Sequence, residues 1–355
     1  MVSSSSSQKI HLPNSKMSFD SKLIEIIHDN KFAAPLLTSF AVIGALFFSL
    51  KSLSFLRMLY DVYIRPGKSL KHFGAGKDTW AVITGASDGI GKEFALQLAE
   101  AKFNVLLISR TLSKLQDLSS EIESKYNVKS KVYPMNFARG DPKDYENLKN
   151  IIKEFDVGVL INNVGTNHDI PTPFTLESDE VIHDIVEVNI ASLLKITKIV
   201  LPQMLPNNKG LIINIGSFSG MIATPYLSVY SGSKSFMNTW TQALGTELKS
   251  KGIIVENVNT YFVVSAMSKI RRSSFLVPLP KPYVKSVLSK IGVAGGASYV
   301  PFNTNVFPSH ALANWLITNT FSWSFWVKKG LAQQEDIRKR ALRKREREAA
   351  ATKSQ

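Results

Sequence analysis

Short apolar runs alternate with longer amphipathic stretches from residue 79 to about residue 260. The apolar runs predict strands at Thr79–Thr84, Asn104–Ser109, Lys129–Met135, Val157–Asn162, Leu211–Ser217 and Ile253–Asn259. The stretches between them have helical spacing, notably at Gly89–Lys102, Thr111–Tyr126, Ser178–Leu205 and Tyr226–Lys251. Because strands that alternate with helices favour parallel pairing, we expect an α/β fold in which a doubly wound parallel sheet carries helices on both faces.

An uncharged run near the N-terminus, Phe32–Leu50, has a different pattern, because it is apolar all round. Its length is close to the ~20 residues that cross a bilayer core, so we predict a transmembrane helix at 32–50 after a disordered segment at 1–31. The alternatives are a buried core helix and a cleaved signal peptide; a signal peptide is disfavoured because the run is long and starts late. Positive charge dominates the following linker, 51–77, which by the positive-inside rule places the next domain on the cytosolic side.

A second uncharged segment, Ile291–Val327, follows a globular domain that we place at 78–290. Its second half is dense in aromatic residues, which suits a membrane interface. A single crossing would move the basic tail at 328–355 to the far side, against the charge rule, so we predict an in-plane or re-entrant membrane segment. A cover over the substrate-binding region and a dimer surface are the alternatives.

The charge balance narrows the classes of partner. The chain has 355 residues, with 43 Lys and Arg against 28 Asp and Glu, which gives a net charge of +15 and suggests anionic partners. The basic residues gather in the linker and the tail, which favours anionic membrane lipid and argues against nucleic acid. Cysteine is absent, which excludes disulfides and thiolate metal sites, and the six histidines show no metal-ligand clustering.

A tyrosine and a lysine within the last predicted helix carry candidate chemistry. Tyr230 and Lys234 are four residues apart and therefore share one helix face. A nearby ammonium favours the phenolate and lowers the tyrosine pKa from its usual ~10, so that the phenol can exchange a proton with a carbonyl or alcohol oxygen. Ser217, at the end of a predicted strand, is placed to polarise the same oxygen. Such a pair alone is most often a surface pair, so this prediction depends on the motifs around it.

A glycine-rich turn connects the first predicted strand to the first helix. The stretch Thr84–Gly91 reads TGASDGIG, with glycines at positions 85, 89 and 91. Glycine permits a tight turn and a close approach of the backbone to a pyrophosphate, which the N-terminus of the following helix stabilises. The turn therefore predicts a dinucleotide site.

The order and spacing of these motifs resemble the short-chain dehydrogenase/reductase family over roughly residues 78–290, with Asn162–Gly165 and Asn189 between them. The resemblance implies a Rossmann-type fold and reduction of a ketone by a nicotinamide cofactor. It implies the catalytic set Ser217, Tyr230, Lys234 and Asn189. In that set the tyrosine donates the proton, the lysine lowers its pKa and holds the ribose, the serine stabilises the oxyanion, and the asparagine supports the proton relay.

The same resemblance implies the cofactor contacts. They are Gly85, Ser87, Gly89, Ile90, Gly91, Arg110, Asn136, Asn163, Gly165, Tyr230, Lys234 and Ser265. Arg110 stands where an NAD-preferring fold carries Asp or Glu, and its planar cation suits a 2′-phosphate, so we predict NADPH; a surface arginine is the alternative. Asp88 departs from the basic residue common in NADP-preferring relatives, and Ser265 stands near a position where the family has a threonine.

A closer resemblance, to the fungal very-long-chain 3-oxoacyl-CoA reductases within this family, rests on His168–Phe174, Gly216–Gly220 and Ser265–Ser274. It implies NADPH-dependent reduction of 3-oxoacyl-CoA in fatty-acid elongation at the endoplasmic reticulum membrane. The implied partners are a fatty-acyl-CoA substrate, membrane lipid and the other elongation enzymes, with a homo-oligomer left open. The alternatives are a 17-beta-hydroxysteroid dehydrogenase, another lipid ketone reductase, or an inactive membrane scaffold.

Two adjacent arginines follow the last predicted strand. Arg271 and Arg272 lie in the region that covers the substrate in this fold. Because arginine binds phosphate well, we predict that one or both contact the phosphates of CoA. Solvated side chains, or contacts to lipid headgroups, are the alternatives.

Overall fold

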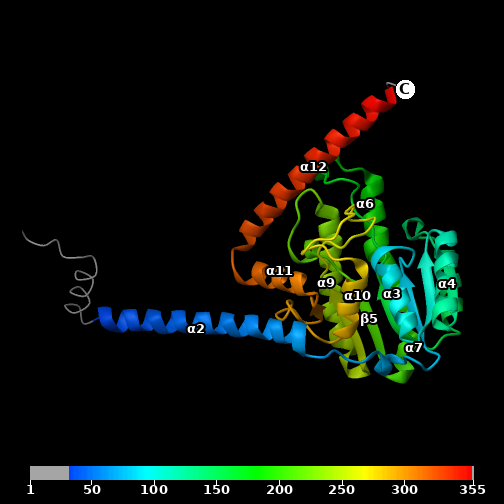
Figure 1. The fold of residues 1–355 in the computed structure, drawn as a ribbon, viewed down its shortest axis with the longest axis horizontal. Helices are drawn as coiled ribbons and strands as arrows, with labels where there is room; N and C mark the ends of the chain where they lie inside the picture. The colour runs from blue at the N-terminus through cyan, green and yellow to red at the C-terminus, as the bar shows by residue number, and fades with distance from the viewer. Residues whose placement is uncertain (1–31, 354–355) are drawn as a thin grey trace, which may run out of the picture. The chain divides into compact units, whose positions relative to one another are not determined.

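The computed structural model describes residues 32–353 (Figure 1). The predicted disordered segment at 1–31 lies outside the described residues. The chain divides into two compact units between Phe55 and Leu56.

The larger unit is built on a sheet of seven parallel strands in the order β3-β2-β1-β4-β5-β6-β7. The strands are β1 Trp80–Thr84, β2 Asn104–Ser109, β3 Ser130–Pro134, β4 Val157–Asn162, β5 Gly210–Ile215, β6 Ile253–Val258 and β7 Asn303–Thr304. The strand order reverses between β1 and β4, which makes the carboxyl ends of these strands the topological switch point where ligands bind in such sheets. The predicted Rossmann-type fold is confirmed.

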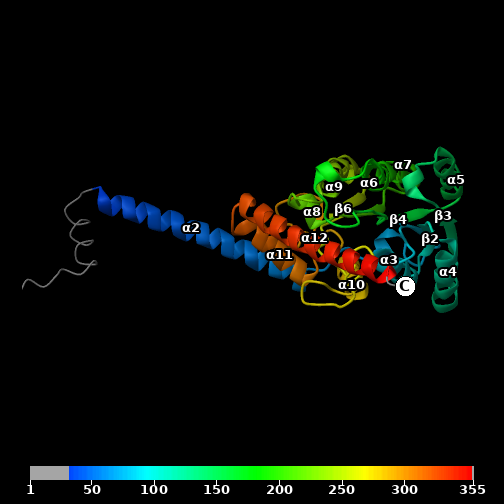
Figure 2. The ribbon, with the colours of Figure 1, turned by 90° about the horizontal axis from the view of Figure 1, so that it is seen from above.

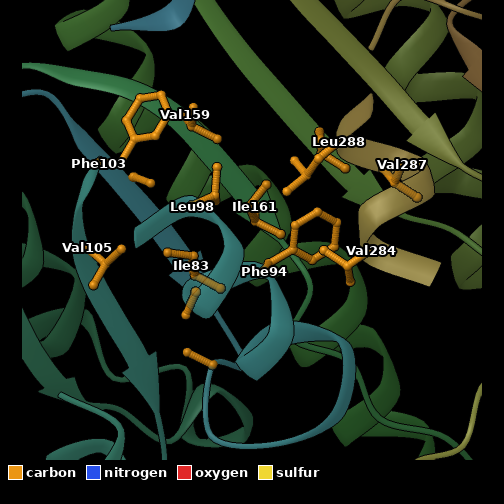
Figure 3. Packing of buried hydrophobic residues seen from close by; sticks show 14 of the residues in the cluster. Ile83, Phe94, Leu98, Phe103, Val105, Val159, Ile161, Val284, Val287 and Leu288 are labelled. Atoms are coloured by element: carbon orange, nitrogen blue, oxygen red, sulfur yellow. The ribbon is translucent and has the colours of Figure 1, made fainter. Parts of the chain in front are cut away.

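Helices cover both faces of the sheet, as Figure 2 shows. One face packs against α3 Gly89–Glu100, α4 Leu112–Tyr126 and α10 Pro280–Ser289. The opposite face packs against α5 Pro142–Ile152, α7 Ser192–Met204 and α9 Ser228–Leu248. Figure 3 shows the first layer, in which Phe94 and Leu98 of α3 meet Ile83 and Ile161 of the sheet. All four side chains are fully buried, so the apolar runs of the strands supply the core.

The long predicted helix at Ser178–Leu205 is interrupted. It consists of α6 Asp179–Val186, a π-helical turn at Glu187–Ala191, and α7. The turn contains Asn189, which is 1 % exposed. A π-turn inserts an extra residue into a helix and is frequent at functional sites.

A row of buried asparagines crosses four neighbouring strands of the sheet. Asn162, Asn214, Asn257 and Asn303 are register partners on β4, β5, β6 and β7. The Asn162 amide donates to Asn214 Oδ1 at 2.9 Å, and the Asn257 amide donates to Asn303 Oδ1 at 2.8 Å. Because buried amides need partners, this register satisfies most of these groups; among the four side chains, Asn257 Oδ1 has no hydrogen-bond partner in the described structure.

The smaller unit contains most of α2 Ala33–Leu59, which a π-turn at Tyr60–Ile64 extends. Its side chains from Leu36 to Leu50 are exposed. Among the described residues, one helix, Ala33–Ile64, is long enough and apolar enough to cross a membrane, judged by length and composition alone. The helix runs past the predicted end at residue 50 into the segment predicted as a basic linker.

The uncharged segment Ile291–Val327 is not one continuous element. Its first part contributes β7 to the sheet, and Ile291, Val293 and Val306 are buried in the core. We predicted that the globular domain ends at residue 290, but the sheet extends to residue 304. The second part forms α11 Pro308–Asn319 and leads into α12 Trp323–Lys353, which includes the predicted basic tail.

Candidate active site

The glycine turn after β1 packs against the end of β4 at the N-terminus of α3. Gly85 has φ +65°, and a Cβ there would lie 2.8 Å from Asn163 Nδ2. A Cβ on Gly91 would lie 2.2 Å from the Gly85 carbonyl oxygen. Side chains are therefore excluded at both positions, and the backbone is left bare where the N-terminus of α3 begins. This cradle fits the pyrophosphate of a dinucleotide.

Asn163 fastens this turn to the end of β4. Its amide donates to the carbonyl oxygens of Thr84 and Gly85, both at 3.1 Å. The Thr84 hydroxyl accepts hydrogen bonds from the backbone N–H groups of Asn163 at 3.0 Å and Val164 at 3.1 Å. The side-chain amide of Asn163 is thus engaged with the protein, which gives it a structural role at the predicted cofactor site.

Three predicted contacts lie at the adenosine side of the turn, among the ends of β1, β2 and β3. Ser87 accepts a hydrogen bond from Ser109 at 2.7 Å. Arg110 is exposed directly after β2. Asn136 caps a short helical turn by accepting from the Ala138 N–H at 3.2 Å. Ile90 lies half-buried in the first turn of α3.

The loop after β6 reaches the glycine turn from the other side. A Cβ on Gly89, which has φ +55°, would lie 3.3 Å from the Ser265 Cβ. Ser265 is held within its own loop, because its hydroxyl donates to the Val263 carbonyl at 3.3 Å and accepts from the Ser268 N–H at 3.2 Å. The structure therefore brings Ser265 to the predicted site.

Tyr230 and Lys234 lie buried in the first half of α9. The Lys234 Nζ is 5.8 Å from the centroid of the Tyr230 ring and donates to the Ile215 carbonyl at 2.7 Å, at the end of β5. Ser217 follows β5 and begins the short helix α8 Phe218–Met221; its side chain hydrogen-bonds the Tyr230 hydroxyl. The structure thus gathers the predicted tyrosine, lysine and serine at the carboxyl edge of the sheet.

Burial governs the ionisation of this group. It lowers the pKa of Lys234 to about 8. It also raises the pKa of Tyr230, although the hydrogen bond from Ser217 opposes that shift. The direction for Tyr230 is opposite to the sequence-based prediction, because desolvation of a buried phenol disfavours its charged form. The phenol is therefore held protonated, the form that can donate a proton.

Asn189 is fixed beside this group by the π-turn. Its Oδ1 accepts from the Thr166 N–H at 2.8 Å, and its amide donates to the Thr166 carbonyl and to Ser233 Oγ, both at 3.0 Å. A Cβ on Gly165 would lie 3.4 Å from Asn189 Oδ1 and 3.8 Å from Lys234 Nζ. A side chain at position 165 would therefore contact both Asn189 and Lys234.

The two predicted substrate arginines are elsewhere on the loop after β6. Arg271 and Arg272 are both exposed, and no side chain in the described part of the chain pairs with either. The structure does not bring them into the buried catalytic group.

Sequence reasoning missed a cluster of ion pairs on the neighbouring loops. Lys269 Nζ donates to Asp169 Oδ1 at 2.5 Å, and Arg345 of α12 also binds the Asp169 carboxylate. Arg338 of α12 donates to the Pro171 carbonyl at 2.6 Å and to Thr172 Oγ1 at 3.1 Å. The only sequence signal was the dense basic charge of the tail, which does not identify a partner in a distant loop.

Comparison with known proteins identifies the family to which this site belongs. A family model for short chain dehydrogenases matches residues 79–274. A very-long-chain 3-oxoacyl-CoA reductase of Aspergillus oryzae is 50 % identical over 86 % of this chain and 89 % of its own. The protein of the same name from Aspergillus terreus is 50 % identical over 86 % and 87 %. A solved short-chain dehydrogenase from Sphingobium yanoikuyae in complex with NADPH matches with a TM-score of 0.57 and 23 % identity, over 68 % of this chain and 92 % of that one. The chain belongs to the short-chain dehydrogenase family and is an NAD(P)-dependent oxidoreductase.

Proposed function

We propose that the protein reduces very-long-chain 3-oxoacyl-CoA to 3-hydroxyacyl-CoA with NADPH. The observation that carries the reaction is the meeting of the buried Tyr230 and Lys234 with the half-buried Ser217 near the glycine turn. The substrate class rests on the relatives from both Aspergillus species, whose printed name is that of this reductase and which match most of the chain.

The surroundings of each catalytic residue suit it to a different role in the reduction. When bound, the nicotinamide cofactor supplies hydride to the ketone carbon. Tyr230, held protonated by burial, donates its proton to the ketone oxygen. Ser217 hydrogen-bonds the same oxygen and stabilises the charge that develops there. Lys234, mostly protonated near neutral pH because its pKa is about 8, supplies a cation that eases loss of the proton from Tyr230.

Asn189 acts as a positioning residue in this proposal. It ties the loop after β4 to α9 through Thr166 and Ser233. Its place beside Gly165 and Lys234 suits a relay that returns a proton to Tyr230 through Lys234.

The preference for NADPH follows from Arg110. Its side chain is exposed directly after β2, where the ribose of a bound dinucleotide lies in this fold. A guanidinium there binds a 2′-phosphate bidentately, whereas the ribose of NAD offers only hydroxyls. Among the remaining predicted contacts, Ser265 lies against Gly89 of the glycine turn.

Substrate binding and membrane attachment involve other parts of the chain. Arg271 and Arg272, exposed on the loop after β6, contact phosphates of the CoA moiety. The helix at Ala33–Ile64 anchors the protein in the endoplasmic reticulum membrane with the catalytic domain facing the cytosol. The aromatic second half of the predicted segment, Ala311–Val327, which carries the exposed Phe321 and Trp323, contacts the membrane interface. The other enzymes of fatty-acid elongation are its partners.

The test is NADPH oxidation by the full-length protein in detergent, with 3-oxoacyl-CoAs of graded chain length offered beside steroid ketones. We expect turnover of the 3-oxoacyl-CoAs and preference for long chains. Preferential turnover of a steroid ketone would instead assign a hydroxysteroid dehydrogenase. No NADPH oxidation with any ketone would contradict the proposal altogether.

A further inference from the structure

Three segments that are distant in the sequence meet at Asp169. This residue lies in the loop after β4, Lys269 lies in the loop after β6, and Arg345 lies on α12. Lys269 also donates to the Asp169 backbone carbonyl at 2.7 Å. We call Asp169, Lys269 and Arg345 the rim cluster. In it, two cations converge on one carboxylate.

The rim cluster is exposed to solvent. The side chains of Lys269, Arg345 and Asp169 are 62 %, 53 % and 66 % exposed. An exposed ion pair contributes little net stability, because water solvates the separated charges nearly as well. The two cations can therefore exchange their carboxylate for another anion at small cost, provided that the anion offers at least as many acceptor oxygens.

The cluster stands on the loops that frame the catalytic group. The loop that carries Lys269 also places Ser265 against Gly89, and the Met267 Cε lies 3.7 Å from where a Cβ on Gly165 would be. The loop that carries Asp169 begins directly after Gly165. A ligand whose reacting group lies beside Tyr230 therefore leaves the site past these loops, and a charged group on a long arm reaches their exposed side.

We infer that Lys269 and Arg345 form a binding site for a phosphate group of the acyl-CoA, and that Asp169 holds the two cations in place until the phosphate replaces it. The inference rests on the proposed function, since it takes a CoA thioester as the substrate. A phosphate suits this pair because the guanidinium binds two of its oxygens and the ammonium binds a third. The C-terminal helix thereby becomes part of the substrate-binding surface.

Arg338 supports this role of α12. Its bonds to Pro171 and Thr172 hold the helix to the same loop as Asp169, and Tyr226 contacts Glu335 of the helix at 3.5 Å. The buried face of α12 includes Gln334, which is 6 % exposed. These contacts fix α12 independently of Arg345, so the helix stays docked when Asp169 releases that side chain.

The experiment compares two substrates that share one reacting group. The full-length protein in neutral detergent is given a 3-oxoacyl-CoA and the 3-oxoacyl thioester of N-acetylcysteamine, which lacks phosphates. We expect Lys269→Ala and Arg345→Ala each to raise KM for the CoA thioester by about three- to tenfold, the range for loss of a charge-assisted contact at an exposed site. KM for the uncharged thioester and both kcat values should stay the same.

Asp169→Asn gives the sharpest result, because the inference predicts an improvement. Removing the competing carboxylate should lower KM for the CoA thioester by about twofold or more, on the scale of one exposed ion pair. If the carboxylate serves only to latch the loops, this variant should instead weaken turnover of both thioesters. That loss, or an equal effect of Lys269→Ala on both thioesters, would overturn the inference.

Arg340→Ala is the matched control, since Arg340 is an exposed α12 residue paired with Asp336 at 2.8 Å. It should leave KM for both thioesters unchanged, and an effect as large as that of Arg345→Ala would refute the site by indicating general attraction to the basic helix. A CoA thioester without its 3′-phosphate identifies the bound group: loss of the Arg345→Ala effect assigns the 3′-phosphate, and its persistence assigns the pyrophosphate.

Effects that appear only in anionic lipid vesicles, and not in neutral detergent, would assign the cations to lipid and overturn the inference. Turnover of the uncharged thioester by the unaltered protein tests the reduction itself, so failure of the proposed function is seen separately.

Discussion

Lys234 and Lys269 stand for two regions that differ in burial and in contact with solvent. Lys234 is 5 % exposed, donates to a backbone carbonyl, and has a pKa lowered to about 8 by burial. Lys269 is largely exposed and pairs with a carboxylate that water also solvates. The buried region can tune proton transfer, because each group there is held by several fixed contacts. The exposed rim can select among charged substrates, because its contacts exchange at little cost.

The largest expected effect removes the proton donor from the buried region. Tyr230→Phe should lower the reduction rate by at least about a hundredfold, the lower end of the contribution of a general acid. NADPH binding should be nearly unchanged, because Lys234 and the glycine cradle remain. Lys234→Ala is the comparison, since it should weaken both rate and binding. Steady-state rates and fluorescence titration with NADPH measure the two effects; a Tyr230→Phe protein that keeps more than a few per cent of its rate would contradict the mechanism.

A buried carboxyl outside the catalytic group shows what burial does to a titratable side chain without any part in the reaction. Glu256 of β6 accepts from the Gly292 N–H at 2.5 Å, and burial raises its pKa to about 7. The folded protein therefore keeps this proton when the unfolded chain, near pKa 4.5, loses it. The stabilisation is complete below pH ~4.5 and is lost as pH rises through ~7, a change of about 3 kcal/mol at 1.36 kcal/mol per pKa unit.

Glu256→Gln should remove this pH dependence. The variant should become more stable than the unaltered protein as pH rises from 5 to 8, with little change in kcat, and thermal unfolding across that range measures the difference. Asp169→Asn is the exposed counterpart. The bond with Lys269 lowers the pKa of Asp169, so its smaller contribution has the opposite sign and is lost as pH falls. Parallel melting curves for the Glu256→Gln and unaltered proteins at every pH would contradict the prediction.

Cofactor choice tests an exposed residue that faces the site. Arg110→Asp should raise KM for NADPH by about tenfold or more, since it removes a charge-assisted bond and adds repulsion. NADH should lose much less, so the ratio of the two kcat/KM values should move towards NADH. An unchanged ratio would make Arg110 a solvated surface residue. Lys114, an exposed cation in the first turn of α4, provides the control: Lys114→Ala should leave the ratio unchanged.

The double substitution Arg271→Ala and Arg272→Ala tests the remaining part of the rim. We expect KM for 3-oxoacyl-CoA to rise by about tenfold, as loss of one or two charge-assisted bonds predicts. The kcat, and reduction of an uncharged ketone, should stay almost the same. Equal losses with both kinds of substrate would indicate a folding or membrane effect. A rise in KM smaller than that of Arg345→Ala would rank the rim cluster above these arginines.

The sequence predicted the buried region well because that region obeys local rules. Each predicted strand from Thr79 to Asn259 was observed within two residues of its predicted ends. Strands buried on both faces are written as continuous apolar runs, and the turns between them need glycine at fixed places. The same rules do not foresee a π-turn. The predicted helix at Ser178–Leu205 therefore hid the interruption that positions Asn189.

The C-terminal region was predicted poorly because uncharged sequence fits several environments. The same absence of charge suits a membrane segment and a packed core, and the strand β7 is too short to show alternation. The burial of Val293 and Val306 decides for the core in the first part of that segment. The rim cluster joins residues 169, 269 and 345, and no local pattern predicts such a meeting.

The row of asparagines across β4 to β7 also constrains how the sheet assembles. Each strand in a parallel sheet is recruited from a distant part of the chain, so a shift of one residue is a ready error. A shifted strand here would separate paired amides such as Asn162 and Asn214 and leave their groups buried without partners. Hydrophobic side chains alone would penalise that shift less, because most positions of β4, β5 and β6 are apolar and buried. The amides therefore favour the native register over shifted pairings while the sheet forms.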